Sequence, residues 1–137
     1  MKDIVAIVIW SKPEHIRLAR AVLSAYLRLK EIKEQDILDL ELGLNEALAN
    51  VIKHTYKFDS SKQIKISFGW SEEKRELLIA IRDYGCAVNP TIFCHVSPPN
   101  PYKEGGFGLY IIKKIFDEVE LVNLERGNLL KLRKVFL

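Results

Sequence analysis

Residues 41–54 have the sequence ELGLNEALANVIKH, and this stretch is the most informative part of the chain for its fold class. It lies within a longer run, from Asp36 to His54, in which apolar side chains recur at the three- and four-residue spacing of a helix. Asp36 is a candidate N-cap. Glu46, Asn50 and His54 follow at intervals of four and form a row that does not coincide with the apolar face. We predict a helix that packs into a core and also carries a carboxylate and a carboxamide in line.

The polar row on this helix has two interpretations. Charged and amide side chains most often lie on a solvated helix face, because they usually remain in water. The other interpretation is a cation site, since hard cations prefer the oxygen ligands that such side chains supply. The row alone does not decide between them, and we assign His54 no catalytic role.

The flanking sequence predicts a sheet covered by helices. Strands are expected at residues 4–10, 63–70, 76–82, 119–123 and 129–136, and helices at residues 14–33, at residues 36–54 and after residue 106. Residues 71–74 are expected to connect the second and third strands as a hairpin. This order predicts an α/β (α+β) two-layer sandwich, with a mixed, mainly antiparallel sheet and helices on one face.

Size and composition are typical of one globular domain, expected to span residues 1–137. Of its residues, 48% are hydrophobic, which is enough for a core without a metal or disulfide. The 21 basic and 18 acidic residues are interspersed, so no nucleic-acid patch stands out. No apolar run approaches the roughly 18 residues of a membrane span. Cys86 and Cys94 have neither zinc nor disulfide spacing, which favours a reduced, cytoplasmic location.

Asp83-Tyr84-Gly85 follows the predicted strand at residues 76–82. An aspartate at a strand end can accept a hydrogen bond from an exocyclic amine, and Gly85 permits a tight backbone turn against a flat ligand. Aspartate and glycine are also ordinary turn residues. The segment therefore fits either an amine-binding site or a simple Asx turn.

Gly105-Gly106-Phe107-Gly108-Leu109 opens the last predicted helix. Glycines at this place let backbone N–H groups approach phosphate oxygens, at a helix end that carries a partial positive charge. The segment is neither a Walker sequence nor a GxGxxG after a strand, so both common mononucleotide folds are disfavoured. A flexible hinge is the alternative. Residues 83–106 contain four prolines and little periodicity, which is typical of a long functional loop.

In this order the three segments resemble the motifs of the Bergerat-fold ATPases, the group that includes gyrase, the histidine kinases and MutL. Residues 41–54 look like the N-box of that family, residues 83–85 like its first glycine box, and residues 105–109, continuing through 111–112 and 116–119, like its second. The resemblance covers nearly the whole chain. It is closest to the small serine-protein kinases that act as bacterial anti-sigma factors, and it implies the Bergerat ATP-binding fold.

The resemblance also implies a role for each motif residue. Asn50 would ligate the Mg²⁺ that bridges the ATP phosphates, and Glu46 would be the base that receives the proton of the attacking hydroxyl. Asp83 would bind the adenine amino group, and Gly85 would shape the adenine pocket. The other members of the ATP site would be Gly106, Gly108 and Leu109 at the second glycine box and Asn128 near the C-terminus.

Three features depart from the family pattern. Cys86-Ala87 follows Gly85 where many relatives have a second glycine, and Gly127-Asn128 stands where relatives commonly have a Gly-Thr pair. The loop from about Asn89 to Glu104 would close over the nucleotide as a lid, and it carries several prolines that could stiffen it.

The function implied by the resemblance is a serine-protein kinase that uses Mg-ATP and acts as an anti-sigma factor. Its expected partners are a sigma factor and an anti-anti-sigma protein of the STAS type, whose serine accepts the phosphate; a homodimer is also compatible with the family. No contact with nucleic acid or membrane is expected. The alternative is a non-catalytic, ATP-binding regulatory module of the same fold. A detached histidine-kinase catalytic domain ranks last, because no helix with a phosphoacceptor histidine is recognisable.

Overall fold

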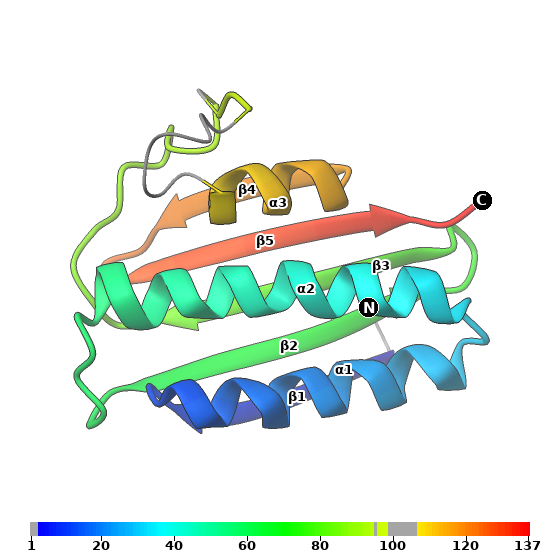
Figure 1. Cartoon of the computed structure of the whole chain (residues 1–137), viewed down its shortest axis with the longest axis horizontal. Helices are drawn as coiled ribbons and strands as arrows, with labels where there is room; N and C mark the ends of the chain where they lie inside the picture. Colours follow the sequence, from blue (N-terminus) through cyan, green and yellow to red (C-terminus); the bar gives the residue numbers. More distant parts are fainter. Residues whose placement is uncertain (1–2, 95, 99–106) are drawn as a thin grey trace.

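The computed structural model describes residues 3–94, 96–98 and 107–137 of the chain. Within these residues, three α-helices lie on one face of a five-stranded sheet (Figure 1). The two-layer arrangement expected from the order of the predicted elements is confirmed.

The sheet is antiparallel at every pairing of the described strands. Its strands are β1 (Asp3–Trp10), β2 (Gln63–Ser71), β3 (Glu76–Asp83), β4 (Glu118–Asn123) and β5 (Asn128–Val135). They lie in the order β1-β2-β3-β5-β4. Because β5 lies between β3 and β4, the end of β3 meets the turn between β4 and β5, which is far from it in sequence. Asp83, Asn128 and Asn123 are direct neighbours in this register.

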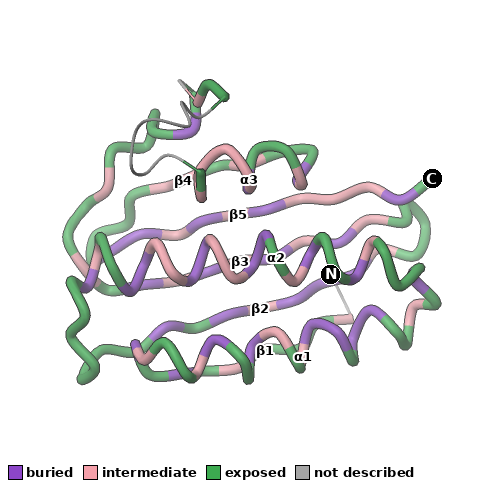
Figure 2. Tube along the Cα trace, in the orientation of Figure 1, coloured by how far each residue is buried: buried purple, intermediate pink, exposed green. Residues whose placement is uncertain are grey.

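Alternation along the central strands explains which face the helices cover. Successive side chains of a strand point to opposite faces, and every second residue of β2 and β3 is buried (Figure 2). The apolar residues that are at most 1% exposed on these two strands are Ile64, Ile66 and Phe68, and Leu77, Ile79 and Ile81. These side chains form the floor on which the helices pack.

The helices are α1 (Ile16–Leu29), α2 (Glu34–Asn50) and α3 (Phe107–Ile115). A 3-10 turn at Pro13–His15 precedes α1, and a π-helical turn at Val51–Thr55 follows α2. No helix of the described residues is both long and apolar enough to cross a membrane.

Two helix boundaries differ from the sequence prediction. The first helix ends at Leu29, earlier than expected, and Glu31 just beyond it has a φ of 59°, in the left-handed region that commonly follows a helix. The second helix begins at Glu34, so Asp36 is not its cap. Asp36 lies instead in the first turn, where a negative charge is favourable at the positive end of the helix dipole.

Helix α2 lies between α1 and α3 (Figure 1). On its sheet-facing side, Leu40, Leu44 and Leu48 are at most 1% exposed. On another side it approaches the residue that follows α3: a Cβ added to Gly43 would lie 2.7 Å from Cε2 of Phe116. A larger residue at this position would push α2 and the end of α3 apart.

The turn between β4 and β5 abuts the end of β3. Gly127 has a φ of 92°, and a Cβ added there would lie 2.0 Å from the carbonyl oxygen of Asp83. We expect Gly127→Ala to lower the free energy of unfolding by more than about 1–2 kcal/mol, the cost of the left-handed conformation alone, because the backbone contact adds to it.

Urea denaturation measures this loss. The control is Arg126→Ala, a change at an exposed position of the same turn, which should leave the midpoint nearly unchanged. Equal midpoints for the two variants would contradict the close packing of Gly127 against β3.

Candidate functional site

A cavity of about 470 Å³ opens where α2 and α3 meet the sheet. It is lined by Ala47, Asn50, Val51, His54, Thr55, Asp83, Val88, Ile92, Phe93, Gly108, Leu109, Leu121 and Leu130. Most of these side chains are apolar, and the polar ones other than Thr55 come from two of the predicted motifs. A largely apolar cavity with a small number of placed polar groups is typical of a small-molecule site.

The polar row of α2 meets the second glycine segment at one end of the cavity. Glu46 and Asn50 are both partly exposed. A Cβ added to Gly108, in the first turn of α3, would lie 3.0 Å from Oε2 of Glu46 and 3.5 Å from Oδ1 of Asn50. Glycine therefore lets the positive end of α3 approach both side chains, and the first N–H groups of a helix have no partner within the helix.

Asp83 forms the other polar end of the cavity, at the last residue of β3. Its side chain is only 4% exposed. Its Oδ1 accepts hydrogen bonds from the backbone N–H of Gly85 and from Nδ2 of Asn128, each at 3.0 Å. The bond from Gly85 is the Asx turn considered from the sequence. No described residue donates to Oδ2, so the turn leaves one carboxylate oxygen for a ligand.

Gly85 does not line the cavity, but it packs against the helical segment that does. A Cβ added there would lie 2.5 Å from Cγ2 of Thr55 and 3.3 Å from the ring of Tyr56. The contact at Thr55 is nine residues beyond the contact at Glu46, so the first and second glycine segments meet different parts of the same helical stretch.

Tyr56 ties the Asp83 segment to the rest of the fold. Its hydroxyl accepts a hydrogen bond from the backbone N–H of Tyr84 at 2.7 Å and donates one to the carbonyl oxygen of Gln63 at 2.6 Å. Burial raises the pKa of the Tyr56 hydroxyl, which therefore stays a neutral donor. The sequence offers no signal for this role beyond an aromatic residue near a helix end.

Asn128 lies behind Asp83 and is not among the residues that line the cavity. It is 1% exposed and uses both ends of its carboxamide. Nδ2 donates to Asp83 and to the carbonyl oxygen of Cys86 at 2.8 Å, while Oδ1 accepts from the N–H of Val88 at 2.9 Å and from Nδ2 of Asn123 at 2.9 Å. The amide thus joins three strand ends to the loop after β3.

Several wall residues were not predicted from the sequence. Val88, Ile92 and Phe93 come from the proline-rich loop, which has no periodicity to mark inward-facing positions. Phe93 is nonetheless only 7% exposed. Leu121 and Leu130 belong to strands whose alternation was recognised, but the alternation does not separate cavity walls from the core.

Part of the predicted site lies outside the described residues. This applies to Gly105 and Gly106 and to residues 95 and 99–104 of the expected lid. Among the described residues, no group of three or more His, Cys, Asp or Glu side chains could hold a metal ion. Within this part of the chain, a cation would depend on one or two protein oxygens, and Mg²⁺ often takes no more because phosphates and water supply the rest.

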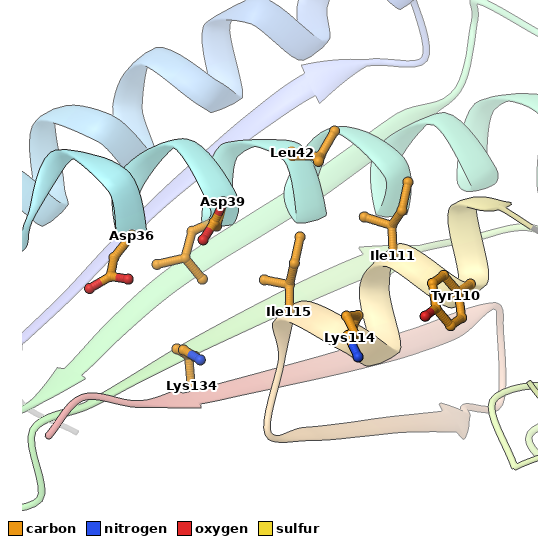
Figure 3. A pocket seen from close by; sticks show the side chains of 9 residues that line it. Asp36, Asp39, Leu42, Tyr110, Ile111, Lys114, Ile115 and Lys134 are labelled. Atoms are coloured by element: carbon orange, nitrogen blue, oxygen red, sulfur yellow. The ribbon is translucent and has the colours of Figure 1, made fainter. Parts of the chain in front are cut away.

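A second hollow, of about 320 Å³, lies between the first half of α2 and the second half of α3 (Figure 3). Its lining includes the apolar side chains of Leu42 and Ile111 and charges of both signs from Asp36, Asp39, Lys114 and Lys134. Because Leu42 precedes Glu46 by one helical turn, this hollow lies on the side of Glu46 that faces away from Asn50.

Comparison with known proteins gives a consistent family. A family described as "Histidine kinase-like ATPase domain" matches residues 9–134. The chain is 32% identical over 126 residues to the serine-protein kinase RsbW of Oceanobacillus iheyensis, a match that covers 88% of this chain and 80% of the relative. It is 28% identical over 130 residues to the serine-protein kinase RsbW of Bacillus subtilis (strain 168), covering 88% and 79%.

A solved structure supports the same fold. The chain superimposes with a TM-score of 0.69 on the RsbU and RsbW domains of Rv1364c from Mycobacterium tuberculosis, at 17% sequence identity. The match covers 98% of this chain and 32% of that longer chain.

The contact between Gly85 and Thr55 generates a prediction about stability. We expect Gly85→Ala to lower the free energy of unfolding by about 1–3 kcal/mol, as overpacking does, because the added methyl group would overlap Cγ2 of Thr55. Thr55→Ala removes that Cγ2. The double variant should therefore be more stable than the sum of the single changes predicts.

Urea denaturation of wild type, both single variants and the double variant measures the coupling. We expect a coupling free energy of at least about 0.5 kcal/mol, as found for residues in contact. Simple additivity of the two changes would mean that the first glycine segment does not pack against the π-helical turn as described.

Proposed function

The chain belongs to the histidine kinase-like ATPase domain family and to the family of the RsbW serine-protein kinases, and from this premise we propose that it is an ATP-dependent protein serine kinase that acts as an anti-sigma factor. The observation that carries the proposal is the cavity with Asp83 at one end and Asn50 and Gly108 at the other. Glu46 does not line this cavity, but its carboxylate lies against Gly108. A nucleotide needs an acceptor for the amino group of its base and a positively polarised site for its phosphates, and the two ends of the cavity offer these.

We infer that the adenine base binds at the Asp83 end. Oδ2, to which no described residue donates, can accept a hydrogen bond from the exocyclic amino group, while the apolar side chains of Val51 and Leu130 provide walls for a flat ring. Asp83 is little exposed, so this bond would form in a site with few competing water molecules.

The phosphates would then reach the first turn of α3. The first N–H groups of a helix, here those around Gly108 and Leu109, have no partner within the helix, and the helix dipole favours an anion. The donor set also fits Mg²⁺, because Oδ1 of Asn50 is a hard oxygen ligand beside the carboxylate of Glu46. Bound magnesium would neutralise phosphate charge, and in this chain Asn50 is the residue proposed to hold it.

Glu46 is proposed to be the general base. No described residue hydrogen-bonds to its carboxylate or forms an ion pair with it, so it is available to a proton donor. The acceptor serine would attack the γ-phosphorus through Oγ as the bond to ADP breaks, and its proton would pass to Glu46. The hollow at Leu42 and Ile111 offers space for the acceptor protein on the side of Glu46 away from Asn50.

The proposed acceptor is a serine of an anti-anti-sigma protein of the STAS type, and the other proposed partner is a sigma factor. The names of the relatives support protein phosphorylation but specify neither partner. The homodimer and the cytoplasmic location expected from the sequence stay predictions. The alternative of a non-catalytic ATP-binding module is weakened by the carboxylate of Glu46, which binding alone does not require.

Glu46→Gln separates these two functions. The change keeps the shape of the side chain but removes the base, so we expect nucleotide affinity to be retained and phosphate transfer to fall by about 10²–10⁴-fold. Single-turnover transfer from labelled ATP to an anti-anti-sigma protein measures the rate, and calorimetry with ADP measures the affinity.

The matched control is Glu41→Gln, which lies on the same helix but is not among the side chains nearest Gly108. It should leave both quantities unchanged. Wild-type transfer by Glu46→Gln would reject Glu46 as the base, and absence of transfer by the wild-type protein to any such partner would favour the non-catalytic module.

A further inference from the structure

We propose that Asn128 is the positioning residue of the adenine end: it fixes Asp83 so that one oxygen is engaged by the protein and the other is presented to the base as an acceptor. Asn128 thereby controls discrimination between purines that carry an amino group and purines that carry a keto group. This inference rests on the proposed nucleotide site but concerns a residue that does not line the cavity.

The hydrogen-bonding capacity of the Asn128 side chain is fully used. A carboxamide has two N–H donors and an oxygen that can accept two bonds. Here both donors have acceptors, in Asp83 and Cys86, and the oxygen has two donors, in Val88 and Asn123. With 1% exposure, Asn128 cannot turn toward a ligand without leaving several buried polar groups unpaired.

These partners also fix the direction of the amide. If its oxygen and nitrogen were exchanged, the oxygen would face two acceptors, and the nitrogen would face two donors. Only one of the two orientations satisfies the surroundings. The Nδ2 group is therefore held against Asp83, directly opposite it in the register of β3 and β5.

The consequence for Asp83 is a fixed carboxylate. Its Oδ1 receives donors from Asn128 and Gly85, whereas no described residue donates to Oδ2. A base with an amino group can donate to that oxygen. A base with a keto group at the same position would bring two acceptors together, and buried polar groups that stay unpaired are the strongest source of rejection in such sites.

The side-chain amide of Asn128 also fixes the position of one residue that lines the cavity. Through the carbonyl oxygen of Cys86 and the N–H of Val88, it holds the loop that follows Gly85, and Val88 lines the cavity. The buried side chain of Asn128 thus fixes both the acceptor, Asp83, and the adjacent apolar residue Val88. The loop that it holds contains Cys86-Ala87 where many relatives have a second glycine.

The test compares ADP with inosine diphosphate (IDP), whose base carries a keto oxygen in place of the amino group. Calorimetry on the full chain gives both dissociation constants. We expect the wild-type protein to favour ADP by about tenfold or more, as a hydrogen bond to a charged group does. In Asn128→Asp, which is nearly isosteric but offers acceptors where Nδ2 donated, the ratio should fall toward one.

The matched control is Asn123→Ala. Asn123 bonds to the carbonyl oxygen of Val88 and to Asn128, but it does not bond to Asp83. Its removal should leave the ratio of the two dissociation constants near the wild-type value. In an Asp83→Asn background, Asn128→Asp should produce no further change in the ratio, because the effect acts through Asp83.

A second measurement uses the wild-type protein and covers the case in which Asn128→Asp does not fold. The side-chain amide protons of Asn128 should remain protected from exchange in the ADP complex and show no nuclear Overhauser contact with adenine protons. A direct contact with the base would overturn the positioning role.

Failure of the inference and failure of the proposed function give different results. A folded Asn128→Asp with the wild-type ratio would overturn the role of Asn128 while leaving the ATP site intact. If the wild-type protein bound neither ADP nor IDP, the proposed nucleotide site itself would be wrong, and the positioning role of Asn128 would be wrong as well.

Discussion

Helix α2 packs on one side against the sheet and on another against α3, and the rest of the site depends on this double contact. Burial of Leu40, Leu44 and Leu48 fixes the rotation of the helix about its axis, at about 1.5–3 kcal/mol for each fully buried leucine. With that rotation set, the row that contains Glu46 and Asn50 faces α3. Two close approaches, at Gly43 and at Gly108, keep α3 near enough for its first turn to reach those side chains. The same interface leaves a hollow on each side of Glu46.

At the other end of the site, the carboxylate of Asp83 is buried, with only 4% of the residue exposed. Burying a charge is costly unless it is hydrogen-bonded, and Asp83 has two donors on one oxygen. The strand order supplies one of these donors, because β5 lies beside β3 and brings Asn128 opposite Asp83. Tyr56 and Gly127 hold the backbone on either side. The same network leaves the other carboxylate oxygen without a donor from the described residues.

Much of this arrangement could be predicted from the sequence. Periodicity identified the strands and helices, and the three motif segments converge on one cavity, apart from Gly106, which lies outside the described residues. The roles of Tyr56 and Asn128 could not be predicted, because they depend on which strand ends become neighbours and on hydrogen bonds between residues more than 25 positions apart. The sequence did not predict that Phe93 and Val88 line the cavity, because an irregular loop has no periodic pattern that marks its buried side. The observed helix ends differ from the predicted ones by a few residues. They depend on the backbone conformation of individual residues, which the amino-acid composition does not specify.

In the proposed function, Asp83 is the acceptor of a nucleotide base in the cavity beside α2. The most direct test is the thermal unfolding midpoint of the wild-type protein and of Asp83→Asn, with and without ADP and magnesium. The substituted side chain can still accept from Gly85 and Asn128, but it presents an N–H donor to the cavity. For the wild-type protein, ADP at a hundredfold excess over its dissociation constant should add about 2.7 kcal/mol of stability and raise the midpoint clearly. We expect Asp83→Asn to fold and to lose most of this rise. An equal rise in both proteins, or none in the wild-type protein at millimolar ADP, would rule out this role of Asp83.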